Sequence, residues 1–180
     1  MSLMYVTGVS ATGKSAVCAA LQRRGYDAHE TDRDGIAVWV NRETGEVAAD
    51  GAVARDRTSG WLERYGWFVV PARVEDIAAR ATGRLVFLCG STENDREVWH
   101  LFSKVIYLTV DEATLRQRLA TRISNEFGKT PDELDAVLKW HAVGADRYRS
   151  LGVCVVDATR PLAEVVDDVI EVATSPPPAP

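Results

Sequence analysis

Two glycines, a lysine and a serine near the N-terminus have the types and the spacing that bind phosphate. Gly8 and Gly13 are separated by four residues, and Lys14 and Ser15 follow directly. Because glycine adopts backbone conformations that other residues resist, successive amide N–H groups can turn toward one anion. The lysine can reach a terminal phosphate, and the serine hydroxyl can bind Mg²⁺. These residues predict phosphate chemistry supported by a divalent cation.

The elements on either side can hold this loop in place. Residues 3–7 form a short apolar run, as in a buried strand, and Val17, Cys18 and Leu21 recur at helical spacing after the loop. The loop therefore lies at a helix N-terminus, whose partial positive charge favours an anion. The complete pattern is that of a P-loop. It predicts ATP and Mg²⁺ as cofactors and ATP contacts from Gly8, Ser10, Ala11, Thr12, Gly13, Lys14, Ser15 and Ala16.

Further short apolar runs alternate with helical patterns along the chain. Such alternation predicts repeated βα units and a parallel sheet buried on both faces. Thr130 and Glu133 have the spacing of a capping box at the start of one of these helices. The runs lie at 84–89, 104–110 and 153–156, and a second strand is expected at 26–31, just before Asp32 and Asp34.

One segment interrupts the alternation. Within about 35–70, the runs 38–40 and 46–48 flank a turn with Gly45 and predict a β-hairpin. We expect a single domain over 1–174 that carries this insertion. A glycine-containing loop at about 123–131 is expected to form a lid, and the proline-rich tail 175–180 is expected to be disordered.

Composition limits the classes of partner. Hydrophobic residues make up 46% and charged residues 26%, as in an ordinary globular protein. The net charge of −5 offers no broad attraction for nucleic acid or anionic lipid. No apolar run reaches the roughly 18 residues of a membrane helix, and the first residues lack the basic and apolar regions typical of a signal peptide. We expect a cytoplasmic protein with a small-molecule partner and neither nucleic acid nor membrane. The sequence is silent on oligomeric state and leaves a homodimer open.

Charged residues further along the chain could complete the site. A carboxylate at Asp32 could hold a magnesium-bound water or accept a proton from a substrate hydroxyl, which makes it a candidate for catalysis and for the metal. Asp34 could grip a substrate hydroxyl, although both acids could also be solvated loop residues. Arg55 and Arg57 could bind a substrate phosphate or carboxylate, or belong to a charged helix start. The side chains of Trp39, Trp61, Trp67 and Phe68 could stack on a nucleobase or pack the insertion.

The order of these motifs resembles that of the adenylate kinase and shikimate kinase group of small-molecule kinases. Thr31-Asp32-Arg33-Asp34 is similar to the Asp-x-Asp motif of shikimate kinases, and 115–122 resembles the lid region. The resemblance implies a three-layer α/β/α fold with a five-stranded parallel sheet of order 2-3-1-4-5. It also implies that Arg118 stacks on adenine and that Arg122 neutralises the transferring phosphoryl group. Arg160 and Pro161, after the last strand, become candidate ATP contacts.

Departures from the shikimate kinase pattern leave the acceptor open. Cys89-Gly90-Ser91-Thr92 stands where a run of three glycines is typical, which argues against shikimate itself. We expect an ATP-dependent phosphotransferase, with Lys14, Asp32 and Arg122 as catalytic residues and a nucleoside or nucleotide as acceptor. A shikimate-kinase-like or sugar-type kinase is the alternative.

Other classes of P-loop protein fit less well. The Asn-Lys-x-Asp motif of a GTPase switch is absent, and 86–89 is not followed by the acidic pair of a mechanical AAA-type ATPase. A regulatory protein that binds ATP without turnover stays open.

Overall fold

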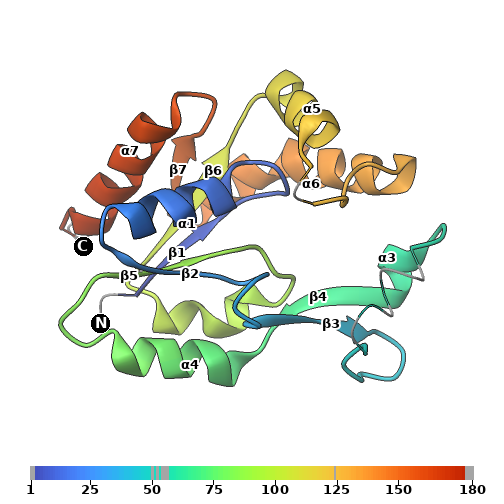
Figure 1. The fold of residues 1–180 in the computed structure, drawn as a ribbon, viewed down its shortest axis with the longest axis horizontal. Coiled ribbons are helices and arrows are strands. Elements are labelled where there is room, and N and C mark those ends of the chain that lie inside the picture. Colours follow the sequence, from blue (N-terminus) through green and yellow to red (C-terminus); the bar gives the residue numbers. More distant parts are fainter. Residues whose placement is uncertain (1–2, 50, 52, 54–56, 124, 177–180) are drawn as a thin grey trace.

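A parallel sheet forms the centre of the molecule (Figure 1). The computed structural model describes residues 3–49, 51, 53, 57–123 and 125–176. All residues of the first strand are buried, as expected for a strand covered on both faces. The strands are β1 (Leu3–Thr7), β2 (Asp27–Glu30), β5 (Val86–Cys89), β6 (Lys104–Thr109) and β7 (Cys154–Asp157).

The strand order corrects one detail of the expectation. The order is β2-β5-β1-β6-β7 in chain labels, rather than 2-3-1-4-5. The labels shift because β3 and β4 fall between β2 and β5 in the chain and pair in a separate sheet. The five parallel strands, counted alone, follow the expected arrangement, and all their pairings are parallel.

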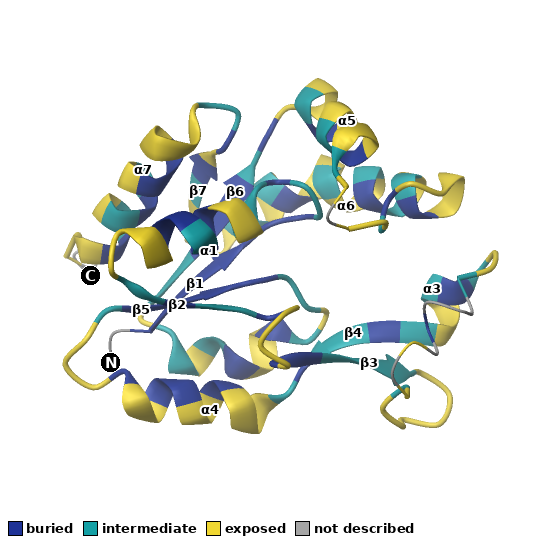
Figure 2. Cartoon of the chain, viewed as in Figure 1, coloured by how far each residue is buried: buried dark blue, intermediate teal, exposed yellow. Residues whose placement is uncertain are grey.

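Helices cover both faces of the sheet and give the expected three layers. Helices α1 (Lys14–Arg23) and α7 (Leu162–Thr174) pack on one face, where their apolar side chains meet those of the strands. Helix α4 (Pro71–Arg80) and the 3₁₀ helix η1 (Asp95–Leu101) pack on the other. Figure 2 shows the buried stripes of these helices facing the strands. The two remaining long helices, α5 (Glu112–Thr121) and α6 (Pro131–Ser150), flank the lid loop.

The insertion forms a β-ribbon, in which the predicted hairpin partner 46–48 is reduced to an isolated antiparallel bridge and the main partner of β3 comes from further along the chain. Strand β3 (Ala37–Asn41) pairs antiparallel with β4 (Tyr65–Val69). The segment 46–48 contributes only an isolated bridge between Val40 and Val47. The side chain of Val47 is 63% exposed, so the bridge buries little apolar surface. Because 65–69 brings a larger apolar surface than 46–48, it is the better partner for β3. The short helix α3 (Trp61–Arg64) precedes β4.

The C-terminal helix ends before the proline-rich segment. Helix α7 ends at Thr174, and Ser175 is its C-cap. The predicted disordered tail continues into 177–180, which lies outside the described residues. No helix in the described part of the chain has the length and apolar character needed to cross a bilayer.

Candidate active site at the P-loop

The glycine loop between β1 and α1 has the backbone geometry that the motif predicts. Gly13 has a φ of 106°, which L side chains rarely adopt. A Cβ at Gly8 would lie 2.5 Å from the carbonyl oxygen of Leu108 on β6, so only glycine fits. Ala11 is the one non-glycine residue with positive φ among the described residues, at 68°. Strain of this kind concentrates at functional sites.

The first turn of α1 is left free for a ligand. No side chain caps its N-terminus, and no acidic residue lies in its first turn. The Asp111 side chain caps α5 and that of Thr130 caps α6, whereas α4 and α7, like α1, have no side-chain cap. The first amides of a helix have no partner within the helix. The uncapped amides of α1 therefore fit a phosphate group, which is the ligand that such a terminus prefers.

Lys14 supplies a positive charge to this cradle. Its Nζ donates to the carbonyl oxygens of Gly8 and Val9 at 2.8 and 2.9 Å. Burial lowers the pKa of Lys14 to about 8, and the negative charge of Asp32 opposes this shift. An incoming phosphate would replace the lost solvation and favour the charged ammonium.

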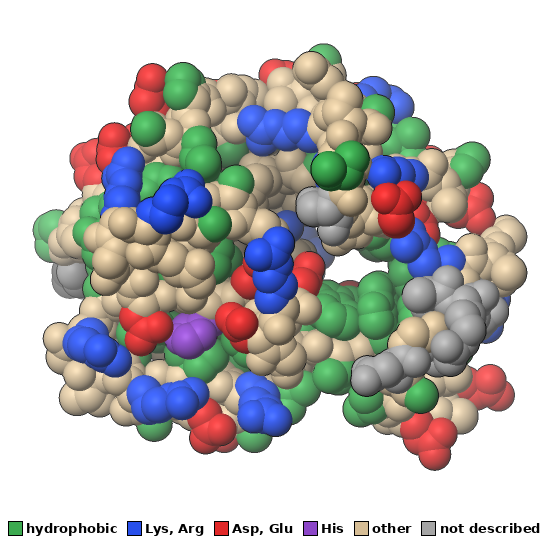
Figure 3. All heavy atoms as spheres, in the orientation of Figure 1, with side chains coloured by type: hydrophobic (Ala, Val, Ile, Leu, Met, Phe, Trp, Pro, Cys, Tyr) green, Lys and Arg blue, Asp and Glu red, His purple; other side chains and the backbone are tan. Residues whose placement is uncertain are grey.

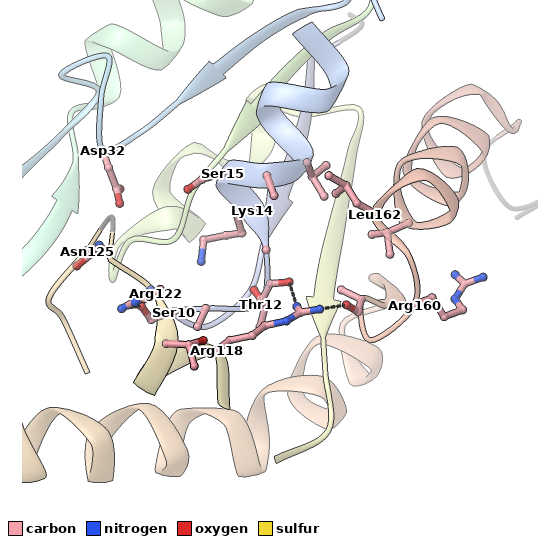
Figure 4. A pocket seen from close by; sticks show the side chains of 17 residues that line it. Ser10, Thr12, Lys14, Ser15, Asp32, Arg118, Arg122, Asn125, Arg160 and Leu162 are labelled. Carbon is pink, nitrogen blue, oxygen red and sulfur yellow. Dashed lines mark hydrogen bonds between the residues drawn. The ribbon is translucent and has the colours of Figure 1, made fainter. Parts of the chain in front are cut away.

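A cavity of about 390 Å³ opens on the P-loop (Figure 4). Arg118 of α5 spans it, donating to the carbonyl oxygens of Thr12 at 3.4 Å and Ala158 at 2.8 Å. Arg160 also lines this cavity, but Figure 4 shows its side chain directed away from the P-loop, and it pairs with Asp168. The other lining residues from the predicted ATP contacts are Ser10, Ala11, Thr12, Gly13, Lys14, Ser15 and Ala16. Gly8 lines the neighbouring cavity, and Pro161 lines neither.

Arg122 reaches the same loop from the end of α5. The helix ends at Thr121, and Arg122 is its C-cap. Its Nη2 donates to Ser10 Oγ at 3.0 Å and to the carbonyl oxygen of Phe127. Burial lowers the pKa of this guanidinium, and Asp32 opposes the shift. Arg122 Nε is buried without a hydrogen-bond partner. A group with unused donors beside the P-loop suits an anionic ligand.

The acid that contacts Ser15 is Glu30, which the sequence analysis missed. Glu30 is the last residue of β2, its side chain is 12% exposed, and it accepts a hydrogen bond from Ser15 Oγ. Arg33 pairs with it at 3.1 Å. The available signal was the position of Glu30 at the carboxyl end of a predicted parallel strand, which is the edge where ligands bind in such sheets.

The two predicted acids lie in different places. Asp32 lines the P-loop cavity and also the larger cavity beside it. Its Oδ1 accepts a hydrogen bond from Thr31 Oγ1 at 2.9 Å. Asp34 lines neither cavity, and its Oδ2 accepts the Glu30 amide at 2.9 Å. The structure therefore brings Asp32 to the P-loop but not Asp34, which stabilises the turn after β2.

The larger cavity measures about 640 Å³ and extends under the insertion. Figure 3 shows the molecule hollowed between the β3–β4 ribbon and the segments opposite, with hydrophobic side chains along the ribbon. Polar groups from η1 and α6, including Asp95, Arg96 and Arg147, complete the wall. The two cavities share Ser10, Lys14, Asp32 and Asn125. The aromatic residues of its wall are Trp39, Trp61, Trp67, Phe127, Trp140, Tyr107 and Tyr148, whereas Phe68 is not among them.

Of the two arginines predicted to bind substrate, the structure describes Arg57, and its side chain is already paired within the protein. Arg57 lines the larger cavity, but its guanidinium forms a bidentate ion pair with buried Glu133 at 2.6 and 2.7 Å. Its charge is thus neutralised by the protein. Arg55 lies outside the described residues.

Comparison with known proteins places the chain in a family. The fold and the loop define a P-loop protein with the fold of small-molecule kinases, as the resemblance implied. Residues 5–139, well over half of the chain, match a family described as an AAA domain. The chain belongs to this family. The description names a domain and no reaction. No curated protein matches the chain significantly.

Solved structures with the same fold cover nearly the whole chain. A sugar kinase from Janibacter sp. HTCC2649 is 18% identical with a TM-score of 0.54, covering 95% of this chain and 93% of its own. A gluconokinase from Sinorhizobium meliloti 1021 is 20% identical with a TM-score of 0.52, covering 96% and 91%. Shikimate kinase from Acinetobacter baumannii, in complex with shikimate, is 15% identical with a TM-score of 0.59, covering 96% and 92%. At these identities the likeness concerns the fold.

Proposed function

We propose that this chain is a phosphotransferase that uses Mg-ATP to phosphorylate a small molecule. The observation that carries the proposal is the meeting of two cavities at Ser10, Lys14, Asp32 and Asn125. One cavity is built around main-chain amides that suit a triphosphate, and the other has the size and mixed lining of a small-molecule site. A group transferred between two substrates must lie where their sites join.

The residues at this junction suit phosphoryl transfer. Lys14 is placed to contact the terminal phosphates, and Arg122 is placed to offset the charge on the phosphoryl group. Asp32 faces the larger cavity, so it can accept the proton that an acceptor hydroxyl loses on attacking the γ-phosphorus. The new O–P bond forms as the bond from phosphorus to the bridging oxygen breaks, and ADP leaves.

Ser15 and Glu30 fit the side of the site where Mg²⁺ would bind. In the described residues, no group of three or more His, Cys, Asp or Glu side chains could hold a metal alone. Mg²⁺ characteristically binds through one or two protein oxygens together with phosphate oxygens and water. The Ser15 hydroxyl and the Glu30 carboxylate are such oxygens, and they are in contact. Bound Mg²⁺ would neutralise phosphate charge. This arrangement leaves Asp32 for the acceptor.

The aromatic wall favours a nucleoside or nucleotide as acceptor. Trp39 packs against Trp61 and Trp67, with ring centroids 5.1 and 4.9 Å apart, and all three indoles line the larger cavity. Flat heterocycles bind such walls by stacking. A polyhydroxylated acceptor is the second candidate, because structures with this fold include the gluconokinase and the sugar kinase.

A coupled assay of ADP release tests the function and names the acceptor. The panel contains nucleosides, nucleoside monophosphates, shikimate, gluconate and simple sugars, each with Mg-ATP. We expect acceptor-dependent turnover with a base-containing compound and none in Lys14→Ala, which should keep its circular dichroism spectrum. Tight ATP binding without turnover on any acceptor would favour a regulatory protein. Turnover restricted to gluconate or sugars would favour the second candidate.

A further inference from the structure

One buried carboxylate connects the insertion to the lid loop. Glu133 is 0% exposed. Its Oε1 accepts hydrogen bonds from Arg57 Nε at 2.8 Å, Arg57 Nη2 at 2.6 Å and Trp61 Nε1 at 3.0 Å. Its Oε2 accepts from Arg57 Nη2 at 2.7 Å and from the Gly128 amide at 2.8 Å. Donors from two segments far apart in sequence thus converge on one side chain.

This arrangement departs from the capping box that the sequence predicts. The Thr130 half is present, since Thr130 Oγ1 accepts the Glu133 amide at 3.4 Å. In a capping box the glutamate side chain would return to the N-cap amide. The carboxylate of Glu133 instead turns to the insertion and the lid loop. A fully buried charge is tolerated only when it is paired and hydrogen-bonded, so its position is tightly determined.

The Glu133 carboxylate stays ionised in this setting. Burial alone would raise its pKa, but hydrogen bonds from Arg57 and the Gly128 amide outweigh burial and lower it. The Arg57 guanidinium also lies over the Trp61 ring, 5.5 Å from its centroid. Trp61 in turn packs edge-on against Trp39 and Phe127. The carboxylate is therefore part of the support behind the aromatic wall.

The lid-loop peptide held by Glu133 also touches the P-loop arginine. Gly128 donates its amide to Glu133, and the carbonyl oxygen of the preceding residue, Phe127, accepts from Arg122 Nη2. The same nitrogen donates to Ser10 Oγ at 3.0 Å. A continuous series of hydrogen bonds thus runs from the acceptor wall through one peptide to the P-loop.

We propose that Glu133 is a positioning residue: it fixes the acceptor wall and the lid-loop peptide together, and through that peptide it holds Arg122 against the P-loop. The proposal rests on the proposed phosphotransferase function. It assigns Arg57 to the support of the site, in place of the substrate contact that the sequence predicts. Occupation of the larger cavity and orientation of Arg122 are then linked.

Steady-state kinetics of Glu133→Gln test this link. We expect kcat/KM for the acceptor to fall about 10- to 100-fold, since small misplacement of catalytic groups has costs of this size. The Kd of Mg-ATP measured without acceptor should rise by a smaller factor, because Glu133 reaches the P-loop cavity only through Arg122, which lines it. Asp132→Asn is the matched control, since exposed Asp132 bonds only Ser59 Oγ in the described residues, at 3.0 Å. Equal kinetics in the two variants would overturn the proposal.

Hydrogen exchange of the lid loop gives a readout that does not need turnover. Arg57→Gln should speed exchange at Gly128, although Arg57 touches that amide only through Glu133, and Asp132→Asn should not. Unchanged exchange at Gly128 in Arg57→Gln would overturn the coupling. If wild-type protein phosphorylates no acceptor, the proposed function fails, while the exchange experiment still decides the role of Glu133.

A milder variant covers the case in which Glu133→Gln does not fold. Trp61→Phe keeps an aromatic, though smaller, ring and removes the indole N–H that donates to Glu133. It should lower acceptor kcat/KM and speed Gly128 exchange in the same direction, by smaller factors. Loss of acceptor affinity without faster exchange at Gly128 would limit Trp61 to the wall and contradict the link.

Discussion

The two cavities that meet at Lys14 are built in different ways. The P-loop cavity takes eight of its lining residues from one continuous segment, 10–17, and its phosphate-binding groups are main-chain amides at an uncapped helix start. The larger cavity is formed by side chains from β3, β4, η1, α6 and the lid loop. A main-chain cradle recognises phosphate whatever molecule carries it, whereas a wall of side chains distinguishes one molecule from another. The nucleotide side should thus be general and the acceptor side specific.

Asp32→Asn should have the largest effect, because Asp32 lines both cavities. An amide cannot accept the acceptor's proton, so kcat should fall about 10³-fold, within the range of general-base contributions. Asp34→Asn is the matched control and should leave kcat and KM unchanged, since Asp34 lines neither cavity and contacts the Glu30 amide and His29 instead. ADP release measures both. A larger loss in Asp34→Asn than in Asp32→Asn would reverse this assignment.

Glu30→Gln should affect the metal side of the P-loop cavity. The amide keeps the shape of the side chain but removes the negative charge next to Ser15, so kcat should fall about 10²-fold and recover in part at high Mg²⁺. A titration of activity against Mg²⁺ concentration checks this. Glu126→Gln, an exposed lid acid paired with Lys129 at 2.8 Å, serves as control. An unchanged Mg²⁺ requirement would place Glu30 outside the metal site.

Trp67→Ala should separate the two cavities. Removal of one stacking surface from the acceptor wall should raise the acceptor KM about 10-fold, given about 1–3 kcal/mol per stacked base. The Kd of Mg-ATP should stay the same, as Trp67 does not line the P-loop cavity. Kinetics and calorimetry together measure the split. An equal loss on both sides would mean that Trp67 also supports the P-loop cavity.

The pH dependence of nucleotide binding should report on Lys14. Its pKa is lowered to about 8, so the ammonium that attracts phosphate is present below that pH and lost above it. Mg-ATP affinity should fall about fourfold between pH 7 and 8.5. Lys14→Arg, whose guanidinium keeps its charge, should lose this pH dependence even if it binds more weakly. Calorimetric titrations at several pH values test both; a flat wild-type profile would contradict the assigned cause.

Sequence reasoning reached the P-loop side more fully than the acceptor side. The motif predicted the strand, the loop and the helix, and the structure has β1 at Leu3–Thr7 and α1 starting at Lys14. Glu30 was not among the predicted site residues. Which acid lies beside Ser15 depends on the residue at which β2 ends, and the sequence does not fix that residue. The sequence also predicted that 38–40 pairs mainly with 46–48. Turn residues indicate that the chain reverses, but they do not show that the distant strand β4 offers β3 a larger apolar surface.

By itself, the sequence determined the phosphate-binding loop, because the loop's function depends on backbone conformations and a helix start that a few adjacent residues specify. It also determined the βα alternation, which follows from apolar periodicity. Tertiary structure decided the roles of charged side chains. Arg57 and Glu133 are 76 residues apart in sequence, and only folding brings them together. An ion pair depends on distance in space, so no local pattern records that Arg57 is already neutralised.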